Sequence, residues 1–175
     1  HQIENEDLVN IPNWLTLDIR IDDGPWLRAG QVEYLDYVQT LELKQGLLSR
    51  SLRMRDPLGR TTLWEERRLV SMDEPHLAAL EVRLTPENWS GRMTVRSALD
   101  GSVINAGVAR YQQLNSRHLE TLEASQAGDE TIFMRSRMKQ RRREISQAAC
   151  TRLRQDSKPV AHHRTLERLP EFVAQ

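Results

Sequence analysis

Residues 47–70 read LLSRSLRMRDPLGRTTLWEERRLV and contain two alternating runs separated by a turn signal. In the first run Leu48, Leu52 and Met54 fall on one side, as the two-residue period of a half-buried strand requires. The turn signal at residues 56–59 is Asp-Pro-Leu-Gly, the pattern of a type I turn. The stretch therefore predicts an antiparallel hairpin whose Arg- and Glu-rich arms keep at least one face wet.

The same period of two recurs along most of the chain. Further alternating runs occupy residues 15–21, 35–43, 78–84, 93–99, 118–124, 131–138 and 144–153. Their spacing is close to the roughly 8 to 12 residues typical of sandwiches, and no segment sustains a 3.6-residue period for more than about two turns. We expect a single all-β domain over residues 1–175, an antiparallel β-sandwich, whose tail from residue 159 forms either a strand or a short helix.

The run at residues 15–21 has clear boundaries. Pro12 breaks any regular element before it, and Asp22-Asp23-Gly24 ends it with turn chemistry. We expect Gly24 to supply a positive φ in this turn, because glycine adopts that conformation at little steric cost.

The composition indicates a globular chain with a polar surface. Hydrophobic residues make up 38% of the 175 residues and charged residues 29%, which argues against a disordered or membrane-embedded chain. No apolar run approaches the roughly 20 residues that a membrane-spanning helix needs. Cys150 is the single cysteine, which excludes an internal disulfide and a cysteine-based zinc site, and this fits a reducing cytoplasm.

The net charge of zero hides an asymmetry between the two ends. Residues 1–46 hold nine acids and three bases, whereas residues 135–168 hold eleven bases and three acids. Arg135, Arg137 and Lys139 recur at every second position, so we expect them on one strand face, where strands of opposite charge pair across a sheet. No zinc motif, helix-turn-helix spacing or aromatic stacking pattern accompanies them, and we expect no nucleic-acid partner.

No catalytic motif emerges from residue spacing. The chain lacks the phosphate-binding glycine loops, the GxSxG elbow and the HExxH pair. Asp100, Glu65 and Glu66 are carboxylates of the type that cleaves glycosidic bonds, but their spacing selects no pair. His162 and His163 are adjacent and point to opposite faces of a strand, so we predict no metal site.

Residues 99–119, LDGSVINAGVARYQQLNSRHL, interrupt the alternation. An irregular segment of about this length inside a compact domain is usually functional, disordered or a sign of misassigned elements. We interpret it as functional, because it brings Asn, Arg, Tyr and His side chains together.

Three motifs stand out in the chain, and the third contains this segment: ENEDLVNIPNW at residues 4–14, LTPENWSG at 84–91 and SALDGSVINAGVARYQQLNSRHLE at 97–120. They resemble the N-terminal domain of glycoside hydrolase family 65. The resemblance implies a super-sandwich of the galactose-mutarotase kind, followed by a linker and an (α/α)6 barrel that carries the general acid and the phosphate-binding loop. No part of the chain matches the barrel, so no catalytic residue is carried over, and we expect an excised, incomplete piece of a larger enzyme.

For the parent enzyme the resemblance implies inverting phosphorolysis of an α-glucoside such as maltose, trehalose or kojibiose, giving β-glucose 1-phosphate and glucose. The chain would be its non-catalytic domain, inactive alone. Two alternatives stay open: the same domain of a trehalose or maltose hydrolase, and a stand-alone carbohydrate-binding or structural dimerisation module. The implied co-substrate is inorganic phosphate, with no metal or organic cofactor. The implied partners are the barrel of the same polypeptide and, through it, the disaccharide, and the resemblance also permits a homodimer.

Five residues of the matching motifs suit sugar recognition, since amides and guanidinium groups bond to hydroxyls and aromatic faces lie against a pyranose. They are Asn13, Trp14, Asn105, Arg110 and Tyr111. We expect the 100–118 loop to lie against the barrel or the rim of its active site. The alternative is that these side chains satisfy one another inside the sandwich, with Asn105 and Asn115 fixing turns and Arg110 in an internal ion pair.

Overall fold

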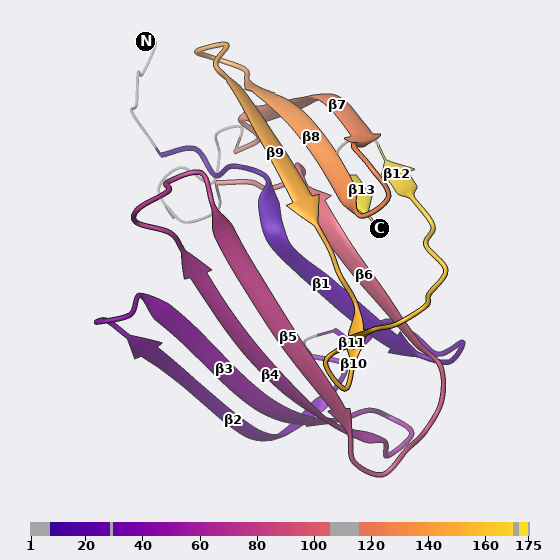
Figure 1. The fold of residues 1–175 in the computed structure, drawn as a ribbon. Coiled ribbons are helices and arrows are strands. Elements are labelled where there is room, and N and C mark those ends of the chain that lie inside the picture. The colour runs from indigo at the N-terminus through magenta and orange to yellow at the C-terminus, as the bar shows by residue number, and fades with distance from the viewer. Residues whose placement is uncertain (1–7, 29, 106–115, 170–171, 175) are drawn as a thin grey trace. The chain divides into compact units, whose positions relative to one another are not determined.

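The computed structural model describes residues 8–28, 30–105, 116–169 and 172–174, and every regular element in them is a β-strand (Figure 1). In chain order the strands are β1 (Asn13–Ile21), β2 (Glu33–Glu42), β3 (Leu47–Arg55), β4 (Thr61–Val70), β5 (Ala78–Pro86), β6 (Met93–Asp100), β7 (Leu119–Gln126), β8 (Thr131–Met138), β9 (Glu144–Cys150), β10 (Arg154–Gln155), β11 (Lys158–Pro159), β12 (Glu167–Leu169) and β13 (Phe172–Ala174). The prediction of an all-β fold is confirmed, and the tail forms strands. Across the described residues, no helix of a length and apolarity suited to crossing a membrane is found.

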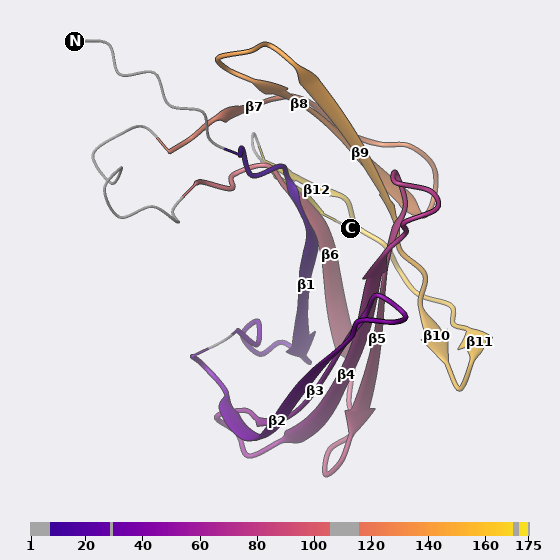
Figure 2. The ribbon, with the colours of Figure 1, turned by 90° about the vertical axis from the view of Figure 1, so that its left-hand side faces the viewer.

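The strands form several sheets, whose orders are β2-β3-β4-β5, β7-β8-β9, β10-β11 and β1-β6-β13-β12 (Figure 2). Neighbouring strands within the first three run antiparallel, as do β6, β13 and β12. This arrangement is consistent with an all-β sandwich. Two compact units contain the elements: Asp18–Val95 is one, and His1–Leu17 with Arg96–Gln175 is the other. The chain passes from one unit to the other within β1 and within β6.

The predicted hairpin is formed by β3 and β4. Their register places Leu48, Leu52 and Met54 on a common face, as expected. In the turn the Gly59 N–H donates to the Asp56 carbonyl at 2.9 Å, and Gly59 has a φ of +79° that favours glycine. The Asp-Pro-Leu-Gly signal therefore fixes the reversal of the chain at the expected position.

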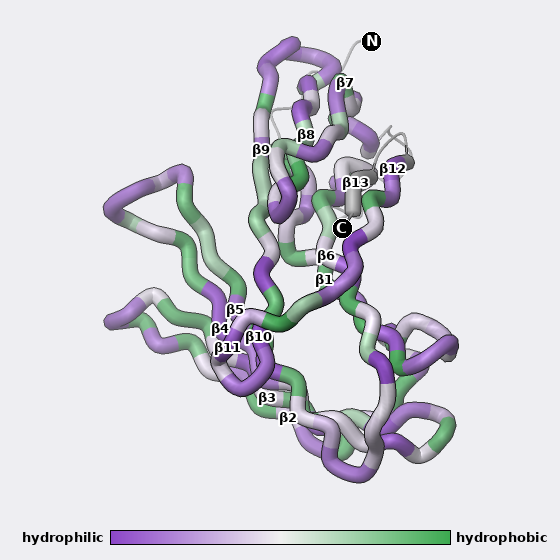
Figure 3. Tube along the Cα trace, turned by 45° about the vertical axis from the view of Figure 1, so that its right-hand side comes forward, coloured by the Kyte–Doolittle hydropathy of each residue, from purple (hydrophilic) through white to green (hydrophobic). Residues whose placement is uncertain are grey.

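The sheet of β2 to β5 has two faces of different character. Its inner face carries the buried side chains of Leu52, Met54, Thr62 and Trp64. Its outer face carries the intervening residues, which are polar or charged along most of β3 and β4. In Figure 3 β4 carries a continuous hydrophilic stretch, because residues 65–68 are Glu-Glu-Arg-Arg and occupy both faces of the strand. The wet face predicted for the hairpin is the outer face.

The turn after β1 differs from the expectation at Gly24. The positive φ, 53°, belongs to Asp22 and not to Gly24. The Gly24 N–H donates to the Ile21 carbonyl at 3.1 Å, and a Cβ at position 24 would lie only 3.0 Å from that oxygen. Glycine is therefore favoured by a close backbone approach, while a short polar side chain tolerates the left-handed conformation at Asp22.

The core of the unit that contains β7 to β9 lies beside β8. Leu99, Ile132 and Met134 are fully buried there, and the half-buried Trp14 and Leu166 pack against them. Burying side chains of this size contributes about 1.5 to 3 kcal/mol each. Through Trp14 and Leu99, this core packs β1 and β6 against the sheet of β7 to β9. Trp14 is the last residue of the motif at 4–14, and Leu99 lies in the motif at 97–120.

Arg135 and Arg137 pair across strands as expected, whereas Lys139 lies in the turn after β8 and not on its face. The guanidinium of Arg135 lies 3.2 Å from the carboxylate of Glu144 and 3.5 Å from that of Glu123. Arg137 lies 3.0 Å from Glu144. Charges of opposite sign on β7, β8 and β9 thus offset one another on the open face of this sheet.

Candidate functional site

The two sequence motifs around residues 4–14 and 97–120 meet at a pair of asparagines. The Asn105 side chain accepts from the Asn10 backbone N–H at 2.9 Å and donates to the Leu8 carbonyl at 2.7 Å. The Asn10 side chain in turn donates to the Ile104 carbonyl at 2.9 Å. The side chain of each asparagine therefore bonds to the backbone of the other segment. Residues 104–105 are joined in this way to residues 8–10, which lead into β1.

Sequence reasoning named Asn105 but missed Asn10, its partner. Asn10 lies inside the motif at residues 4–14, and only the proximity of two motifs in space could have identified it. The Asn105 N–H also donates to the Ser116 carbonyl at 3.0 Å, so both ends of the intervening segment come together at this point. Asn105 acts as the fixed base of the candidate loop.

Asn13 and Trp14 make contacts within their own unit. The Asn13 side chain accepts from the Leu15 N–H at 3.0 Å and donates to the Thr16 hydroxyl at 3.2 Å, which is an Asx-type turn at the start of β1. Trp14 is half-buried against the core of Leu99, Ile132 and Met134. Arg110 and Tyr111 lie outside the described residues, as does Asn115.

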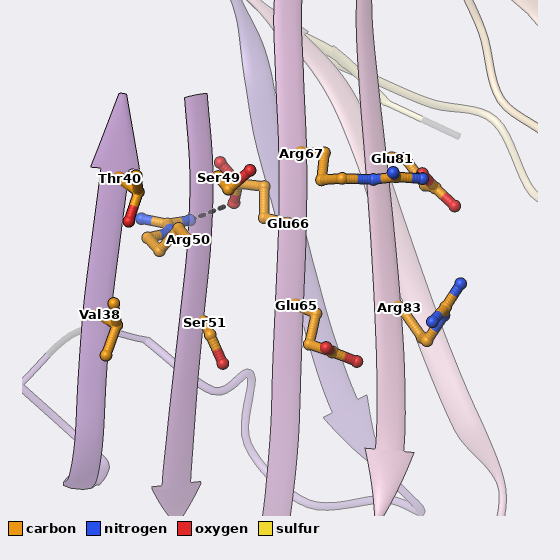
Figure 4. Close-up of a pocket in the computed structure, with 10 residues that line it drawn as sticks. All are labelled: Val38, Thr40, Ser49, Arg50, Ser51, Glu65, Glu66, Arg67, Glu81 and Arg83. Atoms are coloured by element: carbon orange, nitrogen blue, oxygen red, sulfur yellow. Dashed lines mark hydrogen bonds and ion pairs between the residues drawn. The ribbon is translucent and has the colours of Figure 1, made fainter. Parts of the chain in front are cut away.

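A second polar site lies in the other unit, on the outer face of β2 to β5 (Figure 4). It is a shallow hollow of about 370 Å³. Short side chains on β2 and β3 form one side of it and long charged side chains on β4 and β5 form the other. The side chains of the outer face are Val38, Thr40, Ser49, Ser51, Glu65, Arg67, Glu81 and Arg83.

The charged side of this hollow is only partly paired. The Nε of Arg67 donates to Glu81 at 3.0 Å across β4 and β5. Glu65 and Arg83 are register partners on the same two strands, yet among the described residues neither makes an ion pair. Three hydroxyls, a carboxylate and a guanidinium thus face a common space, which is a chemistry that bonds to polyhydroxylated ligands. The sequence predicted the charges, but the hollow depends on side-chain lengths on neighbouring strands and on their register.

Many of the carboxylates of the described residues are paired with arginines. The bond from Arg152, 2.9 Å long, holds the pKa of Glu130 below its usual range, and the bond from Arg137 does the same for the pKa of Glu144. A general acid needs a raised pKa, so these groups are placed for structure. Among the described residues no group of three or more His, Cys, Asp or Glu side chains has the arrangement of a metal site.

Comparison with known proteins gives the family. Residues 1–175 match the model for glycosyl hydrolase family 65, N-terminal domain. An uncharacterised glycosyl hydrolase of Mycobacterium tuberculosis is 44% identical over 158 residues, which cover 90% of this chain and 12% of that protein. A kojibiose phosphorylase of Caldanaerobacter subterraneus subsp. tengcongensis is 32% identical over 117 residues, 67% of this chain and 15% of the relative.

An α,α-trehalose phosphorylase of Thermoanaerobacter brockii is 30% identical over 110 residues, which cover 61% of this chain and 14% of that relative. The chain thus spans less than a fifth of the length of each of these proteins. The match to the family model, in contrast, covers the chain from end to end. This chain belongs to glycosyl hydrolase family 65, as its N-terminal domain.

Proposed function

We propose that the chain is the non-catalytic N-terminal domain of an inverting disaccharide phosphorylase. Its parent would cleave an α-glucoside such as maltose, trehalose or kojibiose with inorganic phosphate, giving β-glucose 1-phosphate and glucose, without a metal or organic cofactor. The observation that carries this proposal is the family match over residues 1–175, together with relatives whose printed names are kojibiose and trehalose phosphorylase.

The arrangement of carboxylates supports a non-catalytic role. Inverting cleavage needs an acid that protonates the leaving oxygen, and hydrolysis needs a second carboxylate to activate water. Glu66 and Glu81 are each paired with an arginine of a neighbouring strand, and Glu87, just after β5, is paired with Arg53 of β3. Each of these carboxylates is engaged in an ion pair within the unit, which suits a structural role.

We further propose that the domain supports a barrel of the same polypeptide in the cytoplasm, through the loop that begins after Asn105. The reciprocal bonds between Asn10 and Asn105 would set where that loop leaves the sheet. Arg110 and Tyr111 would then reach the rim of the active site or the domain interface. Asn13 and Trp14 would hold the start of β1 in place beneath it.

The proposed reaction is tested on the whole polypeptide that contains this chain. It is incubated with maltose, trehalose and kojibiose, each with and without inorganic phosphate, and the products are followed by NMR. We expect one disaccharide to yield β-glucose 1-phosphate and glucose in equal amounts, and only with phosphate present. Glucose release that does not depend on phosphate would instead support the hydrolase alternative.

The loop proposal is tested by Arg110→Ala in the same polypeptide, with steady-state kinetics on the disaccharide that the first assay identifies. A residue at the rim contacts substrate, so we expect KM to rise or kcat to fall. Unchanged kcat and KM would remove Arg110 from the rim.

The hollow on the outer face favours one competing function, a carbohydrate-binding module that acts alone. Its hydroxyls, Glu65 and Arg83 suit a sugar, but none of the side chains that line it is aromatic, so it lacks the stacking platform that sugar sites commonly use. Calorimetric titration of the isolated chain with maltose, trehalose and glucose separates the two functions. Saturable binding by the wild-type chain that is lost in Arg83→Ala would support the module.

A further inference from the structure

The connection between β11 and β12 is fastened to its unit by one arginine. This connection, residues 160–166, which we name the tail strap, runs from the base of the β10–β11 hairpin to β12 (Figure 1). Within it the Nη2 of Arg164 donates to the Thr151 carbonyl at 2.8 Å and lies 3.6 Å from the Glu130 carboxylate. The Arg164 side chain is 21% exposed, so these contacts are largely shielded from water.

Thr151 is a fixed point for this arginine. Its hydroxyl donates to the Ser97 hydroxyl of β6 at 2.9 Å, and its backbone N–H donates to the Glu130 carbonyl at 2.9 Å. Thr151 therefore joins β6 to the turn between β7 and β8. Through Arg164, the tail strap is attached to this junction.

The ring of His162 holds the Nε of Arg164. The Arg164 Nε donates to the His162 Nε2 at 2.7 Å, and the His162 Nδ1 lies 2.7 Å from the Val160 carbonyl. Arginine can only donate and a carbonyl can only accept, so the two partners require a neutral ring with its proton on Nδ1. The bond between His162 and Arg164 therefore exists only while His162 carries no charge.

A protonated His162 is incompatible with this arrangement. Both ring nitrogens of the cation are donors, so an N–H of the ring would meet the N–H of Arg164, and two positive charges would lie side by side. Histidine is the side chain whose charge changes between about pH 5 and pH 8. Lowering the pH through this range therefore breaks the bond.

The charges around His162 oppose a further positive charge. The titratable and charged side chains of the junction come from the β7–β8 turn, the end of β9, the residues after β9 and the strap itself: Glu130, Cys150, Arg152, His162, His163 and Arg164. The bond from Arg152 holds the pKa of Glu130 below its usual range, so Glu130 stays ionised at both ends of the pH range. A charged His162 would be a third cation beside a carboxylate that already serves two arginines.

The position of Arg164 matters for the core. Leu166, two residues further along the strap, packs against the core of Leu99, Ile132 and Met134. The attachment of Arg164 to Thr151 therefore holds the strap at the point where it reaches the core. Loss of that attachment leaves Leu166 to hold the strap alone.

We propose that His162 is a pH-sensitive switch: its neutral ring holds Arg164 in place, and its protonation releases the tail strap. The sheet of β7 to β9 stays folded through this change, because its core side chains Ile132 and Met134 are fully buried and carry no titratable group. The switch is a property of the fold and does not depend on the reaction that the parent enzyme catalyses.

The test is hydrogen–deuterium exchange of the whole polypeptide at about pH 8 and about pH 5, with labelling times scaled to the intrinsic exchange rate at each pH. Residues 160–169 contain amides held by the bond from Val160 to the Leu153 carbonyl and by the β12–β13 ladder. We expect this peptide to exchange about fivefold faster at the lower pH, because the released strap opens more often. The β3–β4 hairpin, in the other unit, should exchange equally at both and is the internal reference. Equal exchange of residues 160–169 at the two pH values would overturn the proposal.

Three variants separate His162 from other effects of acid. His162→Gln keeps an acceptor for Arg164 at every pH, so residues 160–169 should stay protected at about pH 5. His162→Lys carries a permanent charge and should expose them at both pH values. His163→Gln removes the neighbouring histidine and should behave as the wild type. A pH effect that persists in His162→Gln, or that disappears in His163→Gln, would also overturn the proposal.

Discussion

The sheet of β2 to β5 and the sheet of β7 to β9 are built from the same alternation of apolar and charged residues, but they place their charges differently. On β8 the inner positions Ile132 and Met134 are fully buried, while Arg135 lies on the opposite face with Glu144. On β4 a charged residue, Glu66, occupies a buried position on the inner face.

This difference shows what an alternating pattern leaves open. The period of two assigns residues to one side or the other, and it says nothing about what lies against that side. An Arg–Glu pair on an open face is screened by water and contributes little, whereas a buried carboxylate is stable only with its partners in place. The predictions below test whether the two sheets differ in this way.

The largest effect is expected in the core of the sheet of β7 to β9. Met134→Ala removes a fully buried side chain and leaves a cavity, so we expect the free energy of unfolding to fall by about 3 kcal/mol. Urea denaturation followed by tryptophan fluorescence measures it, since the half-buried Trp14 packs against this core. Met134→Leu, which nearly conserves the volume, is the control and should cost under about 1.5 kcal/mol.

The next effect concerns the buried charge of the other sheet. Glu66→Gln leaves Arg50 and Arg68 without their carboxylate, and the loss of one partner of a fully buried pair costs about 3 to 5 kcal/mol. The Arg50 side chain is 34% exposed, so we expect about 2 kcal/mol here. The double variant Arg50→Met with Glu66→Leu should recover much of the loss. A single variant as stable as the wild type would show that this cluster behaves like a surface pair.

The sequence predicted the positions of the strands better than the contacts between residues that are far apart in the chain. The Asp56–Gly59 turn fixed one hairpin, and the regular spacing of apolar residues located most of the other strands, because both signals are local. The pairing of Arg135 with Glu144 also followed from charge and period. The bonds between Asn10 and Asn105 could not be predicted, because 95 residues separate the two side chains and nothing local records their distance.

The same limit applies to Glu66 and to the bulges. Glu65 and Glu66 are indistinguishable as sequence, and only the register decides that Glu66 lies inside. The register in turn shifts at a bulge between Tyr34 and Asp36, and no turn residue signals it. For the candidate site, the sequence therefore predicted which residue types take part, and only the structure showed which residues they bond to.

A smaller effect, of opposite sign, is expected at Ser136. This residue is fully buried on the inner face of β8, and its hydroxyl has no hydrogen-bond partner among the described residues. Ser136→Ala removes a buried polar group that is not satisfied, so we expect the free energy of unfolding to rise by about 1 kcal/mol. Chemical denaturation measures the change. A loss of stability would mean that the hydroxyl has an acceptor in solution, and the two inner faces would then be more alike.

The smallest effect is expected on the open face of β7 to β9, and it should depend on pH. The bonds from Arg137 and Arg135 hold the pKa of Glu144 below its usual range, so the folded state binds this proton more weakly than the unfolded state does. The stabilisation is therefore complete above the unfolded pKa of about 4.3, and it is lost as the pH falls through the lowered folded pKa.

Glu144→Gln should reduce stability slightly at pH 7 and not at all once the carboxylate is protonated. Because the pair is exposed, 1 M salt should also remove most of the difference at pH 7. A difference between wild type and variant that persists in acid and in salt would show that this carboxylate is buried, as Glu66 is.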